Sequence, residues 1–465
     1  MMSSKQNRNG DGMNGKKMEE ELVEVGDYFL EKDEEEEDDE EVSGDEECCL
    51  DGRSVGSDNS DRPDRSLDGG GVYMLGRRYI DMDDFLLKRQ YESSLFWFTY
   101  RKDFAEMAPY GITSDAGWGC MLRAAQMLLS HALRRHYRGP AWRPPLPLKA
   151  RRAEAFASAL LTWMADAAHP SCAYSIHRMV AAGLPLKMLP GEWYGPTTAA
   201  HVIAALTSGH LDHSKQLTTH VASHGALCKH ALHSLMGPDV LASQDSLSHP
   251  LQITNAQYPP PTRWDTALLL ILPLRLGLSS FDHKNYSTTL AHTFSLPQSL
   301  GFLGGSPRHA LWFYAAKADG STLYGLDPHT VQAAPSLSPS LSHHHHPIHL
   351  SDDYLRSVHT TKPAVMDVTK LDPSLALAFY CQDHADFTNL CTSLQNLNNS
   401  CTKQKKPILF DVVERLPDYT NVTDVMAELA GAAADSFSCD ADLLPAAGRR
   451  EDDNDLSDED DYVML

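Results

Sequence analysis

Cys120 is the side chain in this sequence best placed for nucleophilic chemistry. It lies in the segment TSDAGWGCMLR, residues 113–123, directly before a run of apolar residues with helical spacing. The helix dipole and the free backbone N–H groups at a helix N-terminus stabilise a thiolate and lower the pKa of the thiol. Cys48 and Cys49 provide a contrast, because the carboxylates beside them disfavour a thiolate. We therefore predict that Cys120 is a nucleophile rather than an ordinary buried cysteine.

The segment LDPHT, residues 326–330, supplies the two partners that a thiol nucleophile needs. Asp327 and His329 are two residues apart, and on an extended segment such residues point to the same side. A histidine can take the thiol proton, and an aspartate can fix the tautomer of the histidine. One of 23 histidines means little by itself, and an aspartate before proline can also form an Asx turn. Together with Cys120, the pair predicts the chemistry of a cysteine hydrolase.

Helices and buried strands must hold these segments in place. Apolar residues at positions 121, 122, 125, 128, 129, 132 and 133 follow a period of about 3.6 residues and predict a helix that begins at the cysteine. The helices predicted are 120–136, 151–168 and 197–206. The buried strands predicted are 268–273, 311–316 and 322–326, the last of which leads into the Asp-Pro-His turn. Because these elements do not alternate in βαβ units, the predicted fold class is α+β.

The composition divides the chain into three parts. Residues 1–72 are rich in Gly, Ser, Asp and Glu and cannot bury enough apolar surface to fold, so we predict a disordered acidic extension. Residues 73–445 are predicted to form the folded domain, and residues 446–465 a disordered acidic tail. Two polar inserts are expected within the folded domain, near residues 207–261 and 333–347.

The net charge of −23 belongs to the ends of the chain. Residues 1–70 hold 24 acidic and 8 basic residues, and residues 451–461 add eight acidic and no basic ones. The nearly neutral body shows no basic stripe with aromatic residues, so nucleic acid is not a predicted partner. Four histidines at 343–346 lie in a Ser/Pro-rich insert without cysteine or carboxylate partners at defined spacing, which favours a solvated loop over a metal site.

Cysteine usage and hydropathy indicate the compartment. The nine cysteines are irregularly spaced and odd in number, which indicates reduced thiols. The N-terminus lacks the apolar region of a signal peptide. The longest apolar run, residues 267–274, is far shorter than the ~20 residues that span a bilayer. We expect a cytoplasmic protein without a membrane span.

Six segments in this order closely resemble the autophagins, the autophagy-related cysteine endopeptidases. The resemblance covers roughly residues 73–440 and implies a papain-like core with a small auxiliary subdomain. The acidic extension and the Pro307-Arg308-His309 triplet are most similar to the longer C/D-type paralogues. The six segments are YRKDF (100–104), TSDAGWGCMLR (113–123), EWYGPT (192–197), LPLRLG (272–277), PQSLG (297–301) and LDPHT (326–330).

The resemblance implies a role for each residue of the site. Cys120 becomes the nucleophile, His329 the general base and Asp327 the acid that orients it. Tyr100 matches a tyrosine whose backbone N–H, with that of the nucleophile, forms an oxyanion hole; a core aromatic is the alternative. Trp193 matches a tryptophan that covers a narrow groove for the substrate's C-terminal Gly, the residue without a Cβ. Packing of Trp193 on the Gly-Pro turn is its alternative.

The resemblance also implies roles for two further segments. Residues 304–309, with Ser306, Pro307, Arg308 and His309, correspond to a loop that crosses the unliganded site and lifts for substrate, although a plain strand connector is also compatible. Tyr462 and Leu465 follow a run of acidic residues at the C-terminus. This pattern is similar to the short motif that adds a β-strand to ubiquitin-like autophagy modifiers.

The implied function is that of a cysteine endopeptidase that trims the C-terminus of ubiquitin-like autophagy modifiers of the GABARAP type. The exposed Gly can then be conjugated to phosphatidylethanolamine, and cleavage of that amide would release the modifier from membranes. No metal or cofactor is expected, and the enzyme is expected to be a monomer that meets membranes transiently through lipidated substrate. A deubiquitinase-like hydrolase and a weakly active modifier-binding adaptor remain the alternatives.

Overall fold

The computed structural model describes residues 71–415 except 147, 149–153, 168, 209–215, 224, 237–263, 265 and 336–349. The acidic extension up to residue 70, the acidic tail and the histidine run at 343–346 therefore lie outside the described residues. The first strand among the described residues begins at Val72, beside the predicted start of the folded domain at Tyr73. Within the described residues, no helix is long and apolar enough to cross a membrane.

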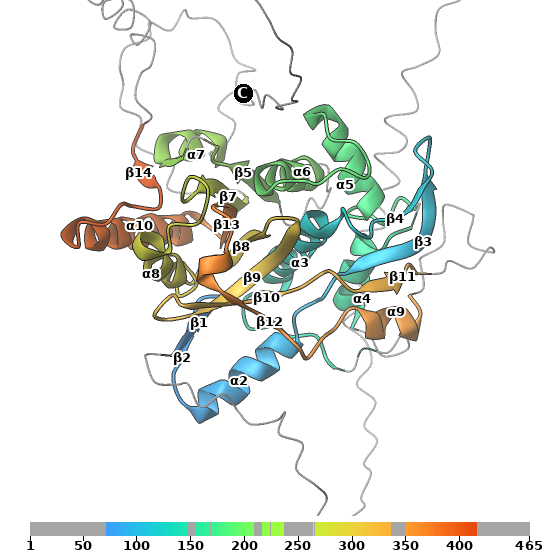
Figure 1. The fold of residues 1–465 in the computed structure, drawn as a ribbon, viewed down its shortest axis with the longest axis horizontal. Helices are drawn as coiled ribbons and strands as arrows, with labels where there is room; N and C mark the ends of the chain where they lie inside the picture. The colour runs from blue at the N-terminus through green and yellow to red at the C-terminus, as the bar shows by residue number, and fades with distance from the viewer. Residues whose placement is uncertain are drawn as a thin grey trace, which may run out of the picture. The chain divides into compact units, whose positions relative to one another are not determined.

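A nine-stranded sheet forms the centre of the fold (Figure 1). Its main path is β12-β10-β9-β8-β13-β7-β5, and β1 pairs with both β2 and β9. Paired strands are antiparallel except β5 and β7, which are parallel. The mainly antiparallel sheet agrees with the predicted α+β class. The strands are β1 (Val72–Met74), β2 (Arg77–Tyr79), β5 (Leu217–Val221), β7 (Ala267–Arg275), β8 (Ser299–Ser306), β9 (His309–Lys317), β10 (Thr322–Leu326), β12 (Ala364–Asp367) and β13 (Ser374–Cys381).

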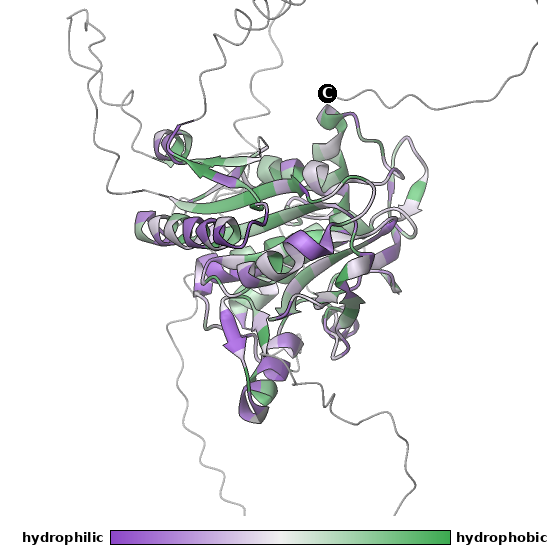
Figure 2. Ribbon diagram, turned by 60° about the vertical axis from the view of Figure 1, so that its left-hand side comes forward, coloured by the Kyte–Doolittle hydropathy of each residue, from purple (hydrophilic) through white to green (hydrophobic). Residues whose placement is uncertain are grey.

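Helices cover both faces of this sheet, because its central strands are apolar on both sides. In β7, Leu269 and Ile271 belong to one hydrophobic core, whereas Leu268, Leu270 and Leu272 belong to the other. Figure 2 shows hydrophobic residues concentrated along these strands. The first core takes in α2 (Met82–Ser93), α3 (Cys120–Arg138), α4 (Ala155–Met164), α5 (Ile176–Gly183), α6 (Pro196–Ser208) and α9 (Asp352–Ser357). The second takes in α7 (Lys229–Met236), α8 (His283–Thr293) and α10 (His384–Lys403). The described residues also form two short 3-10 helices, η1 (Leu184–Leu186) and η3 (Val368–Lys370).

The helix α3 runs through the first core and begins at Cys120. Its apolar face packs on β8 and β9. Arg135, His136 and Arg138 lie in its last turn, where positive charge complements the helix dipole. Gly139 ends the helix with a φ of 80°, a conformation that glycine adopts without strain. The sequence therefore fixes both ends of the helix that carries the thiol.

A smaller sheet lies beside the main one and connects two parts of the site. It has the order β11-β3-β4, with strands β3 (Tyr100–Met107), β4 (Ile112–Ser114) and β11 (Val331–Ala333). In Figure 1 this sheet lies together with α4, α5 and α9 at one side of the main sheet. Because β11 pairs with β3 from Val331 opposite Tyr100, the chain just after His329 is tied to Tyr100. A two-stranded sheet, β6 (Ala226–Cys228) with β14 (Asp411–Val413), lies apart from both.

Most predicted elements are confirmed, and the differences are local. The helices predicted at 120–136 and 197–206 correspond to α3 and α6. The strand predicted at 322–326 has the same bounds as β10. The helix predicted at 151–168 is confirmed as the shorter α4. The polar insert near 207–261 contains β5, β6 and α7, which the sequence analysis does not predict. The strand β5 (sequence LTTHV) is half-buried along its length at the sheet edge, which explains its polar composition.

Candidate active site

The fold brings Cys120, His329 and Asp327 together. Asp327 directly follows β10, and its Oδ1 accepts hydrogen bonds from Nδ1 of His329 at 2.5 Å and from the backbone N–H of His329 at 2.9 Å. The indole N–H of Trp97 donates to the backbone oxygen of Asp327 at 2.7 Å. These bonds fix the tautomer of His329, whose other ring nitrogen is buried and available to the thiol.

The electrostatics of this group favour a thiolate–imidazolium pair. Burial alone would raise the pKa of Cys120, but His329, the backbone N–H of Ala310 and the hydroxyl of Tyr100 hold the pKa below its ordinary value. Burial would likewise lower the pKa of His329, but the hydrogen bond to Asp327 and the nearby thiol raise that pKa to about 9. Opposite shifts on a thiol and an imidazole favour the pair in which the proton is on nitrogen and not on sulfur.

Other buried cysteines behave differently, which shows what the site adds. Burial raises the pKa of Cys172 to about 12 and the pKa of Cys391 to about 12. No histidine is among the groups that shift the pKa of either thiol. The location at the start of α3 and the neighbouring histidine together reverse the effect of burial.

Tyr100 lies at the thiol, but not in the way the sequence analysis expects. Its backbone N–H, expected to be an oxyanion donor, donates to the carbonyl oxygen of Pro328 at 2.9 Å. Its side chain approaches the site instead: the hydroxyl interacts with Cys120, and burial of the phenol raises the pKa of Tyr100. The ring also meets His329 edge-on, with centroids 5.3 Å apart. The hydroxyl of Tyr100, and not its backbone N–H, is therefore the group that contacts the thiol.

Trp193 joins the two sides of the pocket beside the thiol. Its indole N–H donates to the carbonyl oxygen of Gly117 at 2.7 Å, just before the nucleophile helix. The guanidinium of Arg308 lies over its ring, 4.2 Å from the centroid. The side chain is nevertheless 47% exposed. A large aromatic that is held by both walls yet exposed is in a position to cover a bound chain.

The segment predicted as a loop is the end of a tight hairpin. Strands β8 and β9 pair up to Ser306 opposite His309, so the turn consists of Pro307 and Arg308. Arg308 has a φ of 63°. Gly305 has a φ of 152°, and a Cβ there would collide with the carbonyl oxygen of His309, so glycine is required. His309 accordingly belongs to β9 and not to the turn.

This hairpin and Trp193 enclose a pocket next to Cys120. Its volume is about 160 Å³, which admits an extended segment but not a folded domain. Glycines 304 and 305 line one wall, so the backbone approaches the pocket closely there. Other lining residues are Cys120, Met121, Trp193, Tyr194, Pro196, Ser306, Pro307, Arg308, His309, Ala310, Asp372 and Ser374.

A buried ionic network beneath the thiol was not anticipated. The guanidinium of Arg123 contacts Asp115 at 2.7 Å and Asp166 at 2.7 Å, and all three side chains are at most 2% exposed. Asp115 also accepts the backbone N–H of Arg101 at 2.6 Å. A Cβ at Gly119 would collide with the Asp115 carboxylate. The network thus fixes the turn that precedes Cys120. Asp115 and Arg123, both in the segment 113–123, were the only residues in the sequence motif that pointed to it.

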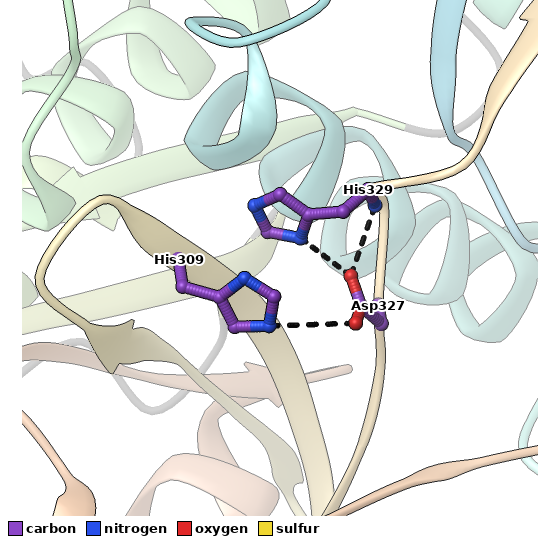
Figure 3. Close-up of side chains that lie close together, drawn as sticks. All are labelled: His309, Asp327 and His329. Carbon is purple, nitrogen blue, oxygen red and sulfur yellow. Dashed lines mark hydrogen bonds and ion pairs between the residues drawn. The ribbon is translucent and has the colours of Figure 1, made fainter.

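A second histidine lies against the Asp327–His329 pair (Figure 3). Nε2 of His309 is 3.4 Å from Oδ2 of Asp327, and the rings of His309 and His329 stack 3.8 Å apart at 15°. Their ligand atoms lie close enough to hold a metal ion. However, nearly parallel rings do not converge on one tetrahedral centre, and Asp327 already serves both rings. We assign no metal to this group. Tyr462 and Leu465 lie outside the described residues.

A thiol at a helix N-terminus, beside a histidine and an aspartate from an antiparallel sheet, defines a cysteine peptidase of papain-like fold. The comparison with known proteins gives the family: the peptidase C54 catalytic domain matches residues 87–393, and the chain belongs to that family. It is 32% identical to cysteine protease ATG4B from Xenopus laevis, covering 79% of this chain and 89% of that protein. It is also 32% identical to cysteine protease ATG4A from Xenopus laevis (75% and 83% covered) and 28% identical to cysteine protease ATG4D from the same species (74% and 75%). The protein is therefore an autophagin, an autophagy-related cysteine protease.

Proposed function

We propose that this enzyme cleaves the C-terminus of ubiquitin-like autophagy modifiers of the GABARAP type, with Cys120 as nucleophile, His329 as general base and Asp327 as the residue that orients it. The observation that carries this proposal is the hydrogen bond of 2.5 Å from Nδ1 of His329 to Asp327, which presents the second ring nitrogen to a thiol of lowered pKa.

The proposed reaction proceeds through a thioester. The Cys120 thiolate attacks the carbonyl carbon of the substrate's Gly, and the Tyr100 hydroxyl with the backbone N–H of Cys120 stabilises the oxyanion. The His329 imidazolium then protonates the leaving amine, and the C–N bond breaks. His329, now neutral, removes a proton from water, which hydrolyses the thioester and releases the Gly carboxylate. Cys120 leaves as the thiolate while His329 keeps the proton taken from water, so the thiolate–imidazolium pair is restored.

The shape of the pocket supports the choice of substrate. A groove covered by Trp193 and lined by Gly304 and Gly305 suits an extended C-terminal tail whose residue at the thiol is Gly. The precursor and the conjugate with phosphatidylethanolamine share the same Gly carbonyl and differ only in the leaving amine. The same residues would therefore cleave both the precursor and the lipid conjugate. The enzyme would act in the cytoplasm as a monomer, and would meet membranes through the lipidated substrate.

An electrophilic probe made from a modifier that ends in a reactive Gly analogue tests the proposal. The expected result is a covalent adduct at Cys120 with the GABARAP-type probe and none with a ubiquitin probe. An adduct with ubiquitin alone would indicate a deubiquitinase-like hydrolase, and no adduct would indicate a modifier-binding adaptor. The matched control is Cys120→Ala, which should bind the modifier but form neither adduct nor trimmed product. Trimming by Cys120→Ala would overturn the assignment of the nucleophile.

A further inference from the structure

The two stacked histidines lie next to the pairing of β9 with β10. His309 is the first residue of β9, and His329 lies three residues after the end of β10. The last pair of the two strands is Leu326 opposite Trp312. The pairing therefore brings the start of β9 near the segment that follows β10, where the two rings stack with centroids 3.8 Å apart.

His309 contacts both of the groups that define the orientation of the proposed base. Its ring covers the ring of His329, and its Nε2 faces the Asp327 oxygen that His329 does not use. The exposed fraction of the side chain is 43% for His309, 37% for Asp327 and 21% for His329. His309 is thus the most exposed of the three, and Figure 3 shows its ring beside both Asp327 and His329.

We infer that His309 is a positioning residue for the proposed catalytic group: by contacting the ring of His329 and the second oxygen of Asp327, it holds His329 in the orientation that faces Cys120. Rotation of the carboxylate would break the bond from Nδ1 of His329, and tilting of the imidazole would move its other nitrogen away from the thiol. The His309 ring restricts both motions. The inference rests on the proposed function of these three residues.

The charges around His309 indicate its protonation state. His329 and Asp327 face it from the segment that follows β10. Arg308 precedes it in the hairpin, and Asp372 lines the same pocket. Burial and the neighbouring charge of His329 lower the pKa of His309 below its ordinary value. Near neutral pH, a neutral ring therefore lies over the His329 imidazolium, an arrangement that avoids like-charge repulsion.

The test compares His309→Ala with His309→Gln and His309→Phe. The Ala variant loses the ring and the donor to Asp327, the Gln variant keeps an N–H donor, and the Phe variant keeps a ring. We expect His309→Ala to lower kcat on modifier precursor on the order of tenfold, because small misplacements of a catalytic group are costly, with KM little changed. The other two variants should recover part of kcat. His230→Ala is the matched control, since His230 is an exposed histidine of α7 away from the pocket.

A substrate-free measurement separates positioning from folding. The ultraviolet absorbance of the Cys120 thiolate is titrated as the difference between each protein and its counterpart that also carries Cys120→Ala. The titration should move to higher pH in His309→Ala, because the imidazolium that stabilises the thiolate is less well aligned, and should not move in His230→Ala. A folded His309→Ala with undiminished kcat and an unshifted titration would overturn the inference. If His309→Ala does not fold, an unshifted titration and undiminished kcat in both the Gln and Phe variants would overturn it.

The same pair of measurements keeps the two proposals apart. A shifted thiolate titration in a protein that cleaves no modifier would support the role of His309 and overturn the proposed substrate. Cleavage of the modifier with an unshifted titration and undiminished kcat in His309→Ala would support the proposed function and overturn the role of His309.

Discussion

The guanidinium of Arg308 lies over the indole of Trp193, 4.2 Å from the ring centroid. This contact joins the turn of the β8–β9 hairpin to the aromatic that covers the pocket. Under the proposed function, a chain that enters the groove would have to separate the two side chains. The contact would therefore stabilise a closed site that substrate opens.

Replacing Arg308 by Ala should lower KM and leave kcat unchanged. A cation–π contact at an exposed site contributes about 0.5–1 kcal/mol, which corresponds to a change in KM of about two- to fivefold. Arg308→Lys, which keeps a cation, should fall between the two. Steady-state kinetics on modifier precursor measures the effect, and a KM that rises in Arg308→Ala would show that Arg308 binds substrate rather than holding the site closed.

Trp193 should determine the preference for Gly at the thiol. A substrate with Ala in place of the scissile Gly should be cleaved poorly, because its Cβ would collide with the covering indole. Trp193→Ala should relax this discrimination in part, while Trp193→Phe, which keeps an aromatic cover, should retain it. The ratio of kcat/KM for the two substrates is the measurement. Equal rates on Gly and Ala substrates with the unmutated enzyme would contradict a closed groove.

Asp327 should control both the rate and the alkaline limit of activity. The carboxylate raises the pKa of His329 to about 9, so the imidazolium persists up to that pH and activity is lost as pH rises further. Without the carboxylate, the pKa should fall toward about 6.5, the ordinary value for histidine, and the alkaline limb of kcat/KM should move to lower pH. Asp327→Ala should also lower kcat by roughly several thousandfold, as for other triad carboxylates. A loss below about tenfold with an unmoved limb would make Asp327 a turn residue only.

The sequence predicts the local parts of this site well. Cys120 is found because a helix begins at it, and Asp327 and His329 because a buried strand leads into them. In contrast, the resemblance predicts a loop at residues 304–309, where Gly304, Gly305 and Pro307 are residue types that favour turns, although 304–306 and 309 belong to strands. Pairing of the strands on either side overrides this local preference. The strand β5 was missed for the opposite reason, because an edge strand does not need an apolar sequence.

Long-range contacts could not be predicted from spacing. The contact of His309 with Asp327 depends on the register of β9 and β10, and the contact of Arg123 with Asp166 joins α3 to the segment after α4. The backbone N–H of Tyr100 is not free to act as the expected oxyanion donor for the same reason. Pairing of β11 with β3 places this N–H against the carbonyl oxygen of Pro328. A residue type can suggest a partner, but only the tertiary fold selects which one.

The Arg123 network makes a prediction about stability. Replacing Arg123 by Met should lower the free energy of unfolding by about 3–5 kcal/mol, because it leaves buried Asp115 and Asp166 without their cation. Lys229→Met is the matched control. Lys229 pairs at 3.1 Å with Glu414, which is 76% exposed, and such a surface pair contributes less than about 1 kcal/mol. Denaturant unfolding of both variants provides the comparison, and equal stability losses would show that the network does not stabilise the fold.

The acidic C-terminal tail should act on binding rather than on chemistry. Tyr462 and Leu465 resemble the two anchors of a strand-forming motif, and residues 451–461 carry eight acidic side chains that suit a basic modifier surface. Deleting residues 451–465 should raise KM with little change in kcat, because a tethered motif increases the local concentration of modifier at the site. The combined change Tyr462→Ala and Leu465→Ala should reproduce the effect. The matched control changes the intervening Val463 and Met464 to Ala and should have a smaller effect, since those positions are spacers.

Since exposed charges are screened by salt, the difference in KM between the full chain and the deletion should shrink at high ionic strength. An unchanged KM after the deletion at both salt concentrations would exclude recruitment by the tail.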